Sequence, residues 1–325
     1  MARMSRRPGR VLLGMATIAA LAATSACSTG NQPTTSASGT TSAATSKCVI
    51  GMTQINQTAA FFTQMNEGAQ QGAKDAGCTL TIANANNDSS KQNSDIENFV
   101  TQGVTGIIVV AIDVNGVPPA IKAARDKGIK VVAIDAKLKD GAVETFVGVD
   151  NEKAGAEAAK WLVDKGLVSG KKYGVVDAKN SFIQNQREDS FRKAVDAAGA
   201  VYTQSVSGDN VQEKAATAAQ NLVTAQPGLD FIYTTGEPAT VGAVSAIPAS
   251  GTTKIVGWDL TREVIAGLDS GAVTAVVQQD PKAEGVQAVK ELKSLLGGAA
   301  AKGFIDVPIT IVTKDNVAPF RAIFP

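Results

Sequence analysis

Several side chains of this sequence combine residue type and position in a way that suits ligand binding. Asp135, Asp259 and Gln279 each stand at the end of a mostly apolar run, Trp258 directly precedes one of them, and the pair Phe61-Phe62 opens an amphipathic segment. Carboxylates and amides bind hydroxyl groups, and a flat ring packs against the C–H face of a sugar or polyol. The inventory therefore favours binding of a neutral, hydroxyl-rich ligand.

The composition excludes several other functions. The 325 residues include no histidine, which removes Ser/His/Asp and Cys/His nucleophiles, HExxH zinc sites and imidazole bases. One enzymatic alternative stays open, a hydrolase that uses Asp135 and Asp259 as an acid/base pair on a carbohydrate. Glycine-rich phosphate loops and calcium-loop patterns are missing, so no cofactor or metal is expected. Lysine and arginine are interspersed with acids, so no nucleic acid is expected.

The polar residues follow strands in a regular alternation of apolar runs and amphipathic segments. The predicted strands are 49–55, 80–85, 106–112, 130–135, 145–149, 173–177, 201–206, 230–235, 254–259 and 273–278. The predicted helices are 61–76, 90–102, 152–165, 186–198, 211–225 and 283–296. Near-continuous apolar strands indicate parallel sheet in βαβ units. Ten strands exceed one comfortable sheet, so we expect an α/β fold of two doubly wound, Rossmann-like domains with the ligand cleft between them.

The N-terminus reads as a bacterial secretion signal. Basic residues up to Arg10 precede an apolar run too short to span a bilayer, and small residues then lead into Cys27. This resembles a lipobox, so we expect a signal peptide over 1–26 and a diacylated Cys27; cleavage after Ala26 without lipidation is the alternative. Residues 27–46 are predicted to form a flexible tether, because they are poor in apolar side chains. The export route, general or twin-arginine, stays open.

Ordered motifs over residues 48–313 resemble a known family. They are Phe61-Phe62, Gly103 to Ile108, Val131 to Asp135, Val147 to Asn151, Arg187 to Phe191, Ile255 to Asp259 and Gln278 to Pro281. Their order is similar to that of the type I periplasmic sugar receptors of the ribose-binding-protein kind. The resemblance implies a substrate-binding lipoprotein of an ABC importer, monomeric, held on the extracytoplasmic face of the cell membrane and working with permease subunits. A receptor for chemotaxis is an alternative, and the effector domain of a transcriptional regulator is a weaker one.

The resemblance also implies ligand-binding roles. Phe61 and Phe62 would sandwich the sugar, Asp135 would bind two ring hydroxyls, and Arg187 would reach across from the second domain. The remaining expected contacts are Asp259, Gln279, Trp258, Glu237 and Asn56, with Asn151, Phe182 and Asn210 as weaker candidates. Two departures, Ala136 and Gly236-Glu237, stand where the family usually has hydroxyl partners, which leaves the identity of the sugar open.

The domain organisation follows from the same interpretation. We expect 47–149 with 280–308 to form the N-terminal lobe, 150–279 with 309–325 to form the C-terminal lobe, and three crossings to form a hinge. Cys48 and Cys78 open the first two strands, and consecutive parallel strands are often neighbours. In an oxidising compartment this predicts a Cys48–Cys78 disulfide, with two buried thiols as the alternative.

Overall fold

The computed structural model describes residues 47–57 and 60–324. The predicted signal peptide, Cys27 and the tether lie outside these residues. Residues 45–325 cluster as one compact unit. Among the described residues, no helix is long and apolar enough to cross a membrane.

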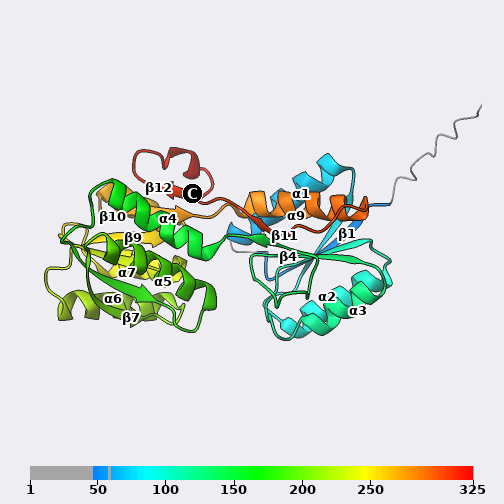
Figure 1. The fold of residues 1–325 in the computed structure, drawn as a ribbon, viewed down its shortest axis with the longest axis horizontal. Helices are drawn as coiled ribbons and strands as arrows, with labels where there is room; N and C mark the ends of the chain where they lie inside the picture. Colours follow the sequence, from blue (N-terminus) through cyan, green and yellow to red (C-terminus); the bar gives the residue numbers. More distant parts are fainter. Residues whose placement is uncertain (1–46, 58–59, 325) are drawn as a thin grey trace, which may run out of the picture. The chain divides into compact units, whose positions relative to one another are not determined.

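Two six-stranded sheets organise the described chain (Figure 1). Sheet A has the order β11-β5-β4-β3-β1-β2, and sheet B has the order β12-β10-β9-β8-β6-β7. The strands are β1 (Val49–Gln54), β2 (Thr79–Asn84), β3 (Gly106–Val109), β4 (Lys130–Ile134), β5 (Thr145–Gly148), β6 (Lys172–Asp177), β7 (Val201–Ser207), β8 (Phe231–Thr234), β9 (Lys254–Trp258), β10 (Val273–Gln278), β11 (Gly303–Asp306) and β12 (Thr310–Val312). All strand pairs are parallel except β10 with β12.

Helices cover both faces of each sheet. They are α1 (Ala60–Ala76), α2 (Ser89–Thr101), α3 (Pro118–Asp126), α4 (Asn151–Asp164), α5 (Phe182–Ala197), α6 (Gln212–Ala225), α7 (Glu237–Ala246), α8 (Arg262–Ser270) and α9 (Pro281–Leu296), followed by the 3-10 turn η1 (Ala318–Phe320). In the N-lobe, sheet A lies between α1 with α9 and α2 with α3 (Figure 1). In the C-lobe, α4 and α5 cover one face of sheet B, and α6, α7 and α8 cover the other.

The ten predicted strands all occur, whereas three helices were missed. The short helices α3 and α8 have nine residues each, and α7 consists largely of small residues that are buried on several sides. Such segments lack the long amphipathic stripe on which the helix prediction depended. Helix α5 also begins at Phe182, four residues before the predicted start, and the short strands β11 and β12 were not predicted.

The chain passes between the two sheets three times. It leaves sheet A after β5, returns after β10, and crosses again between β11 in sheet A and β12 in sheet B. After this return, α9 packs against α1, and the two helices approach closely at two glycines. A Cβ at Gly68 would lie 1.9 Å from the Lys282 carbonyl oxygen, and one at Gly285 would lie 2.2 Å from the Met65 carbonyl oxygen, so a larger residue would clash at either position. Close glycine contacts therefore fix α9 in the N-lobe.

A disulfide joins Cys48 and Cys78, as the sequence predicted. Both residues directly precede neighbouring parallel strands, β1 and β2, whose register pairs Val49 with Thr79. The bridge spans a sequence separation of 30 residues. In the chain-entropy account, a loop of this length stabilises the fold by about 3 to 4 kcal/mol.

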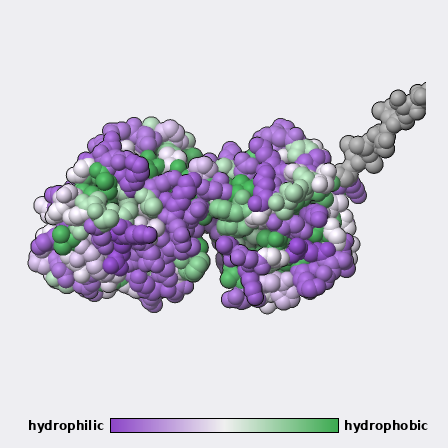
Figure 2. Space-filling view, viewed as in Figure 1, coloured by the Kyte–Doolittle hydropathy of each residue, from purple (hydrophilic) through white to green (hydrophobic). Residues whose placement is uncertain are grey.

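On the face drawn in Figure 2, hydrophilic residues cover most of each lobe, and apolar residues form small separate groups. Such scattered apolar exposure is ordinary for a globular surface. The buried apolar residues instead form four clusters, one on each face of each sheet.

Candidate functional site

Asp135 and Asp259 occupy equivalent positions in the two sheets. Each follows the third strand of its sheet order, β4 or β9, and each adopts a left-handed backbone with φ of 61°. The Asp135 N–H donates to the Val147 carbonyl at 3.0 Å, and the Asp259 N–H donates to the Val277 carbonyl at 2.9 Å. Aspartate tolerates this conformation better than most residues. The chain thus turns out of both sheets at a carboxyl end, where open parallel sheets bind ligands.

The guanidinium of Arg187 is buried and held by three hydrogen bonds. From α5, its Nε donates to Asn151 Oδ1 at 2.7 Å, Nη1 donates to the Thr235 carbonyl at 3.2 Å, and Nη2 donates to Gln279 Oε1 at 3.4 Å. Its Cζ lies 3.7 Å from the centroid of the Trp258 ring, a cation–π distance. Burial lowers the pKa of Arg187, and the carboxylates near it oppose that shift.

Gln279 connects this arginine to an aspartate. While its Oε1 accepts from Arg187, its Nε2 donates to both carboxylate oxygens of Asp259, at 3.0 and 3.2 Å. Gln279 itself is buried. The Arg187–Gln279–Asp259 network is therefore assembled within the C-lobe in the structure as it stands.

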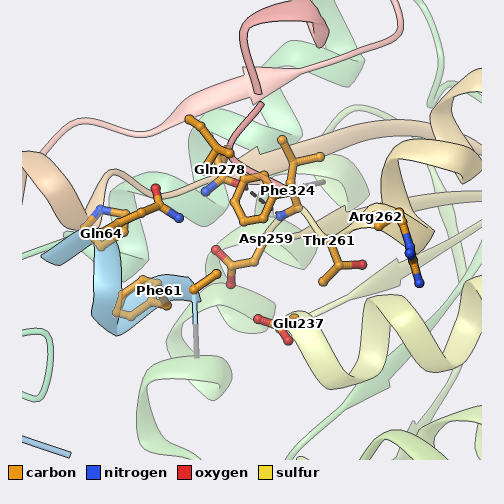
Figure 3. A pocket seen from close by; sticks show the side chains of 12 residues that line it. Phe61, Gln64, Glu237, Asp259, Thr261, Arg262, Gln278 and Phe324 are labelled. Carbon is orange, nitrogen blue, oxygen red and sulfur yellow. Dashed lines mark hydrogen bonds between the residues drawn. The ribbon is translucent and has the colours of Figure 1, made fainter. Parts of the chain in front are cut away.

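A cavity of about 300 Å³ lies beside Asp259 and is lined from both lobes. The N-lobe contributes Phe61 and Gln64 from α1, and the C-lobe contributes Asp259 and Glu237. Figure 3 shows the Asp259 carboxylate between Phe61 and Glu237, with the Phe324 ring close by. The Gln64 Nε2 is buried and has no hydrogen-bond partner among the described residues. The cavity offers a ring, an amide donor and two carboxylates, which is what a polyol requires.

A second cavity, of about 750 Å³, includes Asp135. Its wall carries Phe146 and Phe304, whose rings stack at 5.5 Å, together with Phe182. Phe182 opens α5 and is 71 % exposed, an unusual exposure for phenylalanine. Asp135 therefore lies in a larger open space than Asp259.

The pKa values of three carboxyl groups at these cavities are raised. Burial raises the pKa of Asp135 from 3.8 to about 6, with Arg187 opposing and Asp259 adding to the shift. Burial also raises the pKa of Asp259, against the opposing effects of Arg187 and Gln279. The pKa of Glu237 is raised by burial and then by Asp259 and Glu263. A low dielectric and neighbouring like charges both disfavour the ionised form.

Glu284 is a further acid at this site, and the sequence analysis did not identify it. It lies in the first turn of α9 with a fully buried side chain, and neither carboxyl oxygen has a hydrogen-bond partner among the described residues. Burial raises its pKa well above the usual value, and repulsion from Asp135, Asp280 and Asp259 adds to this. The sequence feature that could have identified Glu284 is its charge among the buried residues of α9, between Pro281 and Ala288.

Comparisons with known proteins identify the family of this chain. A periplasmic binding protein domain matches residues 50–300. The chain belongs to this family. It is 29 % identical over 267 residues to the ribose import binding protein of Bacillus subtilis, covering 82 % of this chain and 87 % of that protein. It is 27 % identical over 276 residues to the xylitol-binding protein of Mycolicibacterium smegmatis, covering 82 % and 78 %. The crystal structure of a periplasmic ribose ABC transporter protein from Conexibacter woesei superposes with a TM-score of 0.79 at 24 % identity, covering 85 % and 95 %.

Membership of the periplasmic binding protein family confirms the predicted resemblance and the predicted two-domain α/β fold. The relatives named above are solute-binding proteins rather than enzymes. The structure places five of the predicted residues in the hydrogen-bond network or the smaller cavity, and four of them are Phe61, Arg187, Asp259 and Gln279. Glu237 also lines the smaller cavity, and Asp135 lines the larger one.

Trp258 requires a correction. It was predicted as a ligand contact, but its side chain is fully buried, and its Nε1 donates to the Tyr233 hydroxyl at 2.7 Å. The guanidinium of Arg187 covers its ring face. Trp258 therefore packs against the guanidinium of Arg187 and is not exposed to the cleft.

Three other predicted residues, Phe62, Asn56 and Asn210, line neither cavity. Phe62 packs against the apolar cluster of sheet A, with its ring 5.5 Å from that of Phe61 in an edge-to-face arrangement, and lines neither cavity described above. Asn56 is half-buried, and its Nδ2 donates to Asn87 Oδ1 at 3.3 Å. Asn210 accepts a hydrogen bond from Gln184. Among the weaker candidates, Asn151 positions Arg187, and Phe182 lines the larger cavity.

Among the described residues, no group of three or more histidine, cysteine, aspartate or glutamate side chains could hold a metal ion. The geometry of the acids at the site suits hydrogen bonding to an organic ligand.

Proposed function

We propose that this protein is an extracytoplasmic receptor that binds a monosaccharide or small polyol between its two lobes and delivers it to an ABC importer. One observation carries the proposal. Asp259 is hydrogen-bonded to Gln279 and through it linked to Arg187, while the same cavity presents Phe61 and an unpartnered Gln64 amide from the other lobe. A ring face combined with convergent donors and acceptors is the chemistry of carbohydrate recognition.

The mechanism we propose is closure about the three chain crossings. A ligand that contacts Asp135 and Phe61 in the N-lobe and Asp259 and Arg187 in the C-lobe binds the closed form more tightly than the open form. It therefore shifts the population towards closure by its differential affinity for the two forms. The closed face would then be recognised by permease subunits of the importer.

A binding screen tests the proposal. Thermal unfolding across pentoses, hexoses and acyclic polyols identifies the ligand, because binding to the native state raises Tm through mass action. Titration calorimetry then measures Kd for the wild type and for Asp259→Asn, with Asp209→Asn as the matched control. Asp209 also has a positive φ at the end of a strand of sheet B, but it pairs with Lys214 on the surface.

We expect Asp259→Asn to weaken binding at least tenfold and Asp209→Asn to leave it unchanged. Small-angle scattering should show compaction with the ligand, and analysis of the mixture should find the ligand intact. Product formation would support the carboxylate hydrolase instead. An absence of binding to every carbohydrate offered would overturn the proposal.

Location and assembly are part of the same proposal. A diacylated Cys27 would hold the receptor on the outer face of the cell membrane, near its permease, with residues 27–46 as the tether. The test is detergent phase partitioning of the expressed full chain against Cys27→Ala. The wild type should enter the detergent phase and the variant the aqueous phase. Light scattering after size exclusion should report a monomer, and a stable dimer would contradict that expectation.

A further inference from the structure

The ligand cleft contains more acid than its own cations balance. Asp259 and Glu237 line the same cavity, and Asp259 raises the pKa of Asp135, Glu237 and Glu284. Arg187 opposes the rise in pKa of Asp135, Asp259 and Glu284. It is not among the charges that act on Glu237. We call these four residues the acid cluster.

Arg187 does not neutralise the acid cluster by direct pairing. Its three hydrogen bonds go to a side-chain amide oxygen, a backbone carbonyl and a second amide oxygen. Arg262 lines the smaller cavity, but its side chain is 76 % exposed, it lies 3.9 Å from Glu263, and Figure 3 shows it turned away from Asp259. Around the larger cavity, Lys137 and Lys139 are both exposed, and Lys137 pairs with Asp140 at 3.6 Å.

Glu284 gives the second, independent observation. A fully buried carboxyl with two unpartnered oxygens is rare, because desolvation without a compensating hydrogen bond is costly. On the same helix, the buried Glu291 shows the usual solution: it accepts from the Thr145 hydroxyl at 2.7 Å and from the Lys302 N–H at 3.1 Å, and it lies 3.5 Å from Lys302 Nζ. Glu284 lacks an equivalent partner among the described residues, and its pKa is raised by Asp135 of the same lobe and by Asp259 of the C-lobe.

A neutral polyol offers these acids hydroxyl groups but no charge. Closing the cleft around it would bury the acid cluster further and favour its protonation. An ammonium group offers three N–H donors and a positive charge, and charge-assisted hydrogen bonds are about twice as strong as neutral ones. We propose that the ligand is a monosaccharide or polyol that carries a primary amine, and that its ammonium group binds at Asp259 within the acid cluster. This inference rests on the proposed function and names its ligand class.

The experiment compares matched ligands. Each set contains an amino compound, its hydroxyl parent and its N-acetyl derivative: a 2-amino-2-deoxyhexose with the hexose, and a 1-amino-1-deoxy polyol with the polyol. Calorimetry on the full mature protein should give a Kd at least tenfold lower for the amine than for both uncharged partners in at least one set. A parent that binds as tightly as its amine would overturn the inference and leave the receptor function standing, whereas no binding in any set would overturn both.

Two variants connect the preference to the acids. Glu237→Gln is compared with Glu263→Gln, since both are first-turn glutamates of neighbouring helices and only Glu237 lines the cavity. Glu284→Gln is compared with Glu291→Gln, since both are buried on α9. The amine preference should fall at least threefold in Glu237→Gln and Glu284→Gln and persist in the two controls. Equal loss in variant and control would overturn the assignment to the acid cluster.

Proton release gives a readout that does not depend on affinity. An ammonium ligand lowers the pKa of the carboxyls around it, so binding at pH 6 should release protons, whereas a neutral parent should release none. Calorimetry in buffers of different ionisation enthalpy measures that number. Glu284→Gln should reduce it, and unchanged release in this variant would contradict the role of Glu284.

Discussion

Substitution of Arg187 by glutamine isolates the contribution of the buried cation. The change removes a charge that donates at 2.7, 3.2 and 3.4 Å and that stacks on Trp258 at 3.7 Å. It leaves the carboxyls of Asp259, Asp135 and Glu284 without the cation that opposes their rise in pKa. Each hydrogen bond that involves a charged group contributes about 1.5 to 3 kcal/mol. Loss of one such bond that positions Gln279 and Asp259 should therefore raise the Kd by about 10- to 150-fold.

The matched control is Arg192→Gln on the same helix. Arg192 also stacks on an aromatic ring, that of Tyr202 at 3.7 Å, and lies 3.5 Å from Glu188, but, unlike Arg187, it is not among the charges that act on the pKa of Asp135, Asp259 or Glu284. Calorimetric titration with the ligand identified by the screen should show an unchanged Kd for Arg192→Gln. Thermal unfolding and circular dichroism verify that both variants are folded. A folded Arg187→Gln protein whose Kd stays within threefold of the wild type would refute the reasoning.

Three further predictions concern stability. Because burial raises the pKa of Asp135 to about 6, the folded state binds more protons than the unfolded state between about pH 4 and 6; the free energy of unfolding should fall as pH rises through this window, and urea titrations of Asp135→Asn should show a weaker dependence. Reduction of the Cys48–Cys78 disulfide should lower the free energy of unfolding by about 3 to 4 kcal/mol, measured by denaturant titration with and without a thiol. Gly68→Ala should lower Tm more than Gly72→Ala, because the new Cβ would lie 1.9 Å from a backbone oxygen in the first case and 3.2 Å from its nearest neighbours in the second; equal losses would contradict this packing argument.

Local sequence patterns were enough to predict the strands and the polar residues that follow them. β-branched runs predict buried strands, and parallel strands place their carboxyl ends together, so Asp135 and Asp259 could be selected before any geometry was known. Helix α7 could not be predicted in this way. Thr240, in its interior, donates to the Trp258 carbonyl and accepts from the Trp258 N–H, so this helix is defined by contacts with β9 rather than by an amphipathic stripe.

Trp258 shows the limit of carrying a role over from a motif. Successive residues of a strand face opposite sides of the sheet, so Trp258 and Asp259 cannot both face the same space while the strand continues. Trp258 points into the cluster that α4 and α5 cover, where it meets Tyr233. Asp259 leaves the sheet through its left-handed turn. The aromatic residue therefore acts on the site only through Arg187, a relation that depends on α5 folding across the strand.

Asp135 and Asp259 occupy equivalent sheet positions in the two lobes, but their hydrogen-bonded surroundings differ. Both place an aspartate after the third strand, but the C-lobe alone connects its aspartate to a buried cation, through Gln279. These C-lobe side chains are ordered before the ligand arrives, so little conformational entropy is lost there on binding. The N-lobe instead contributes the Phe61 ring and Gln64, whose Nε2 has no hydrogen-bond partner among the described residues, and the same is true of both carboxyl oxygens of Glu284. If the proposed closure occurs, the free energy that drives it should therefore come mainly from new N-lobe contacts, since the C-lobe network is already formed.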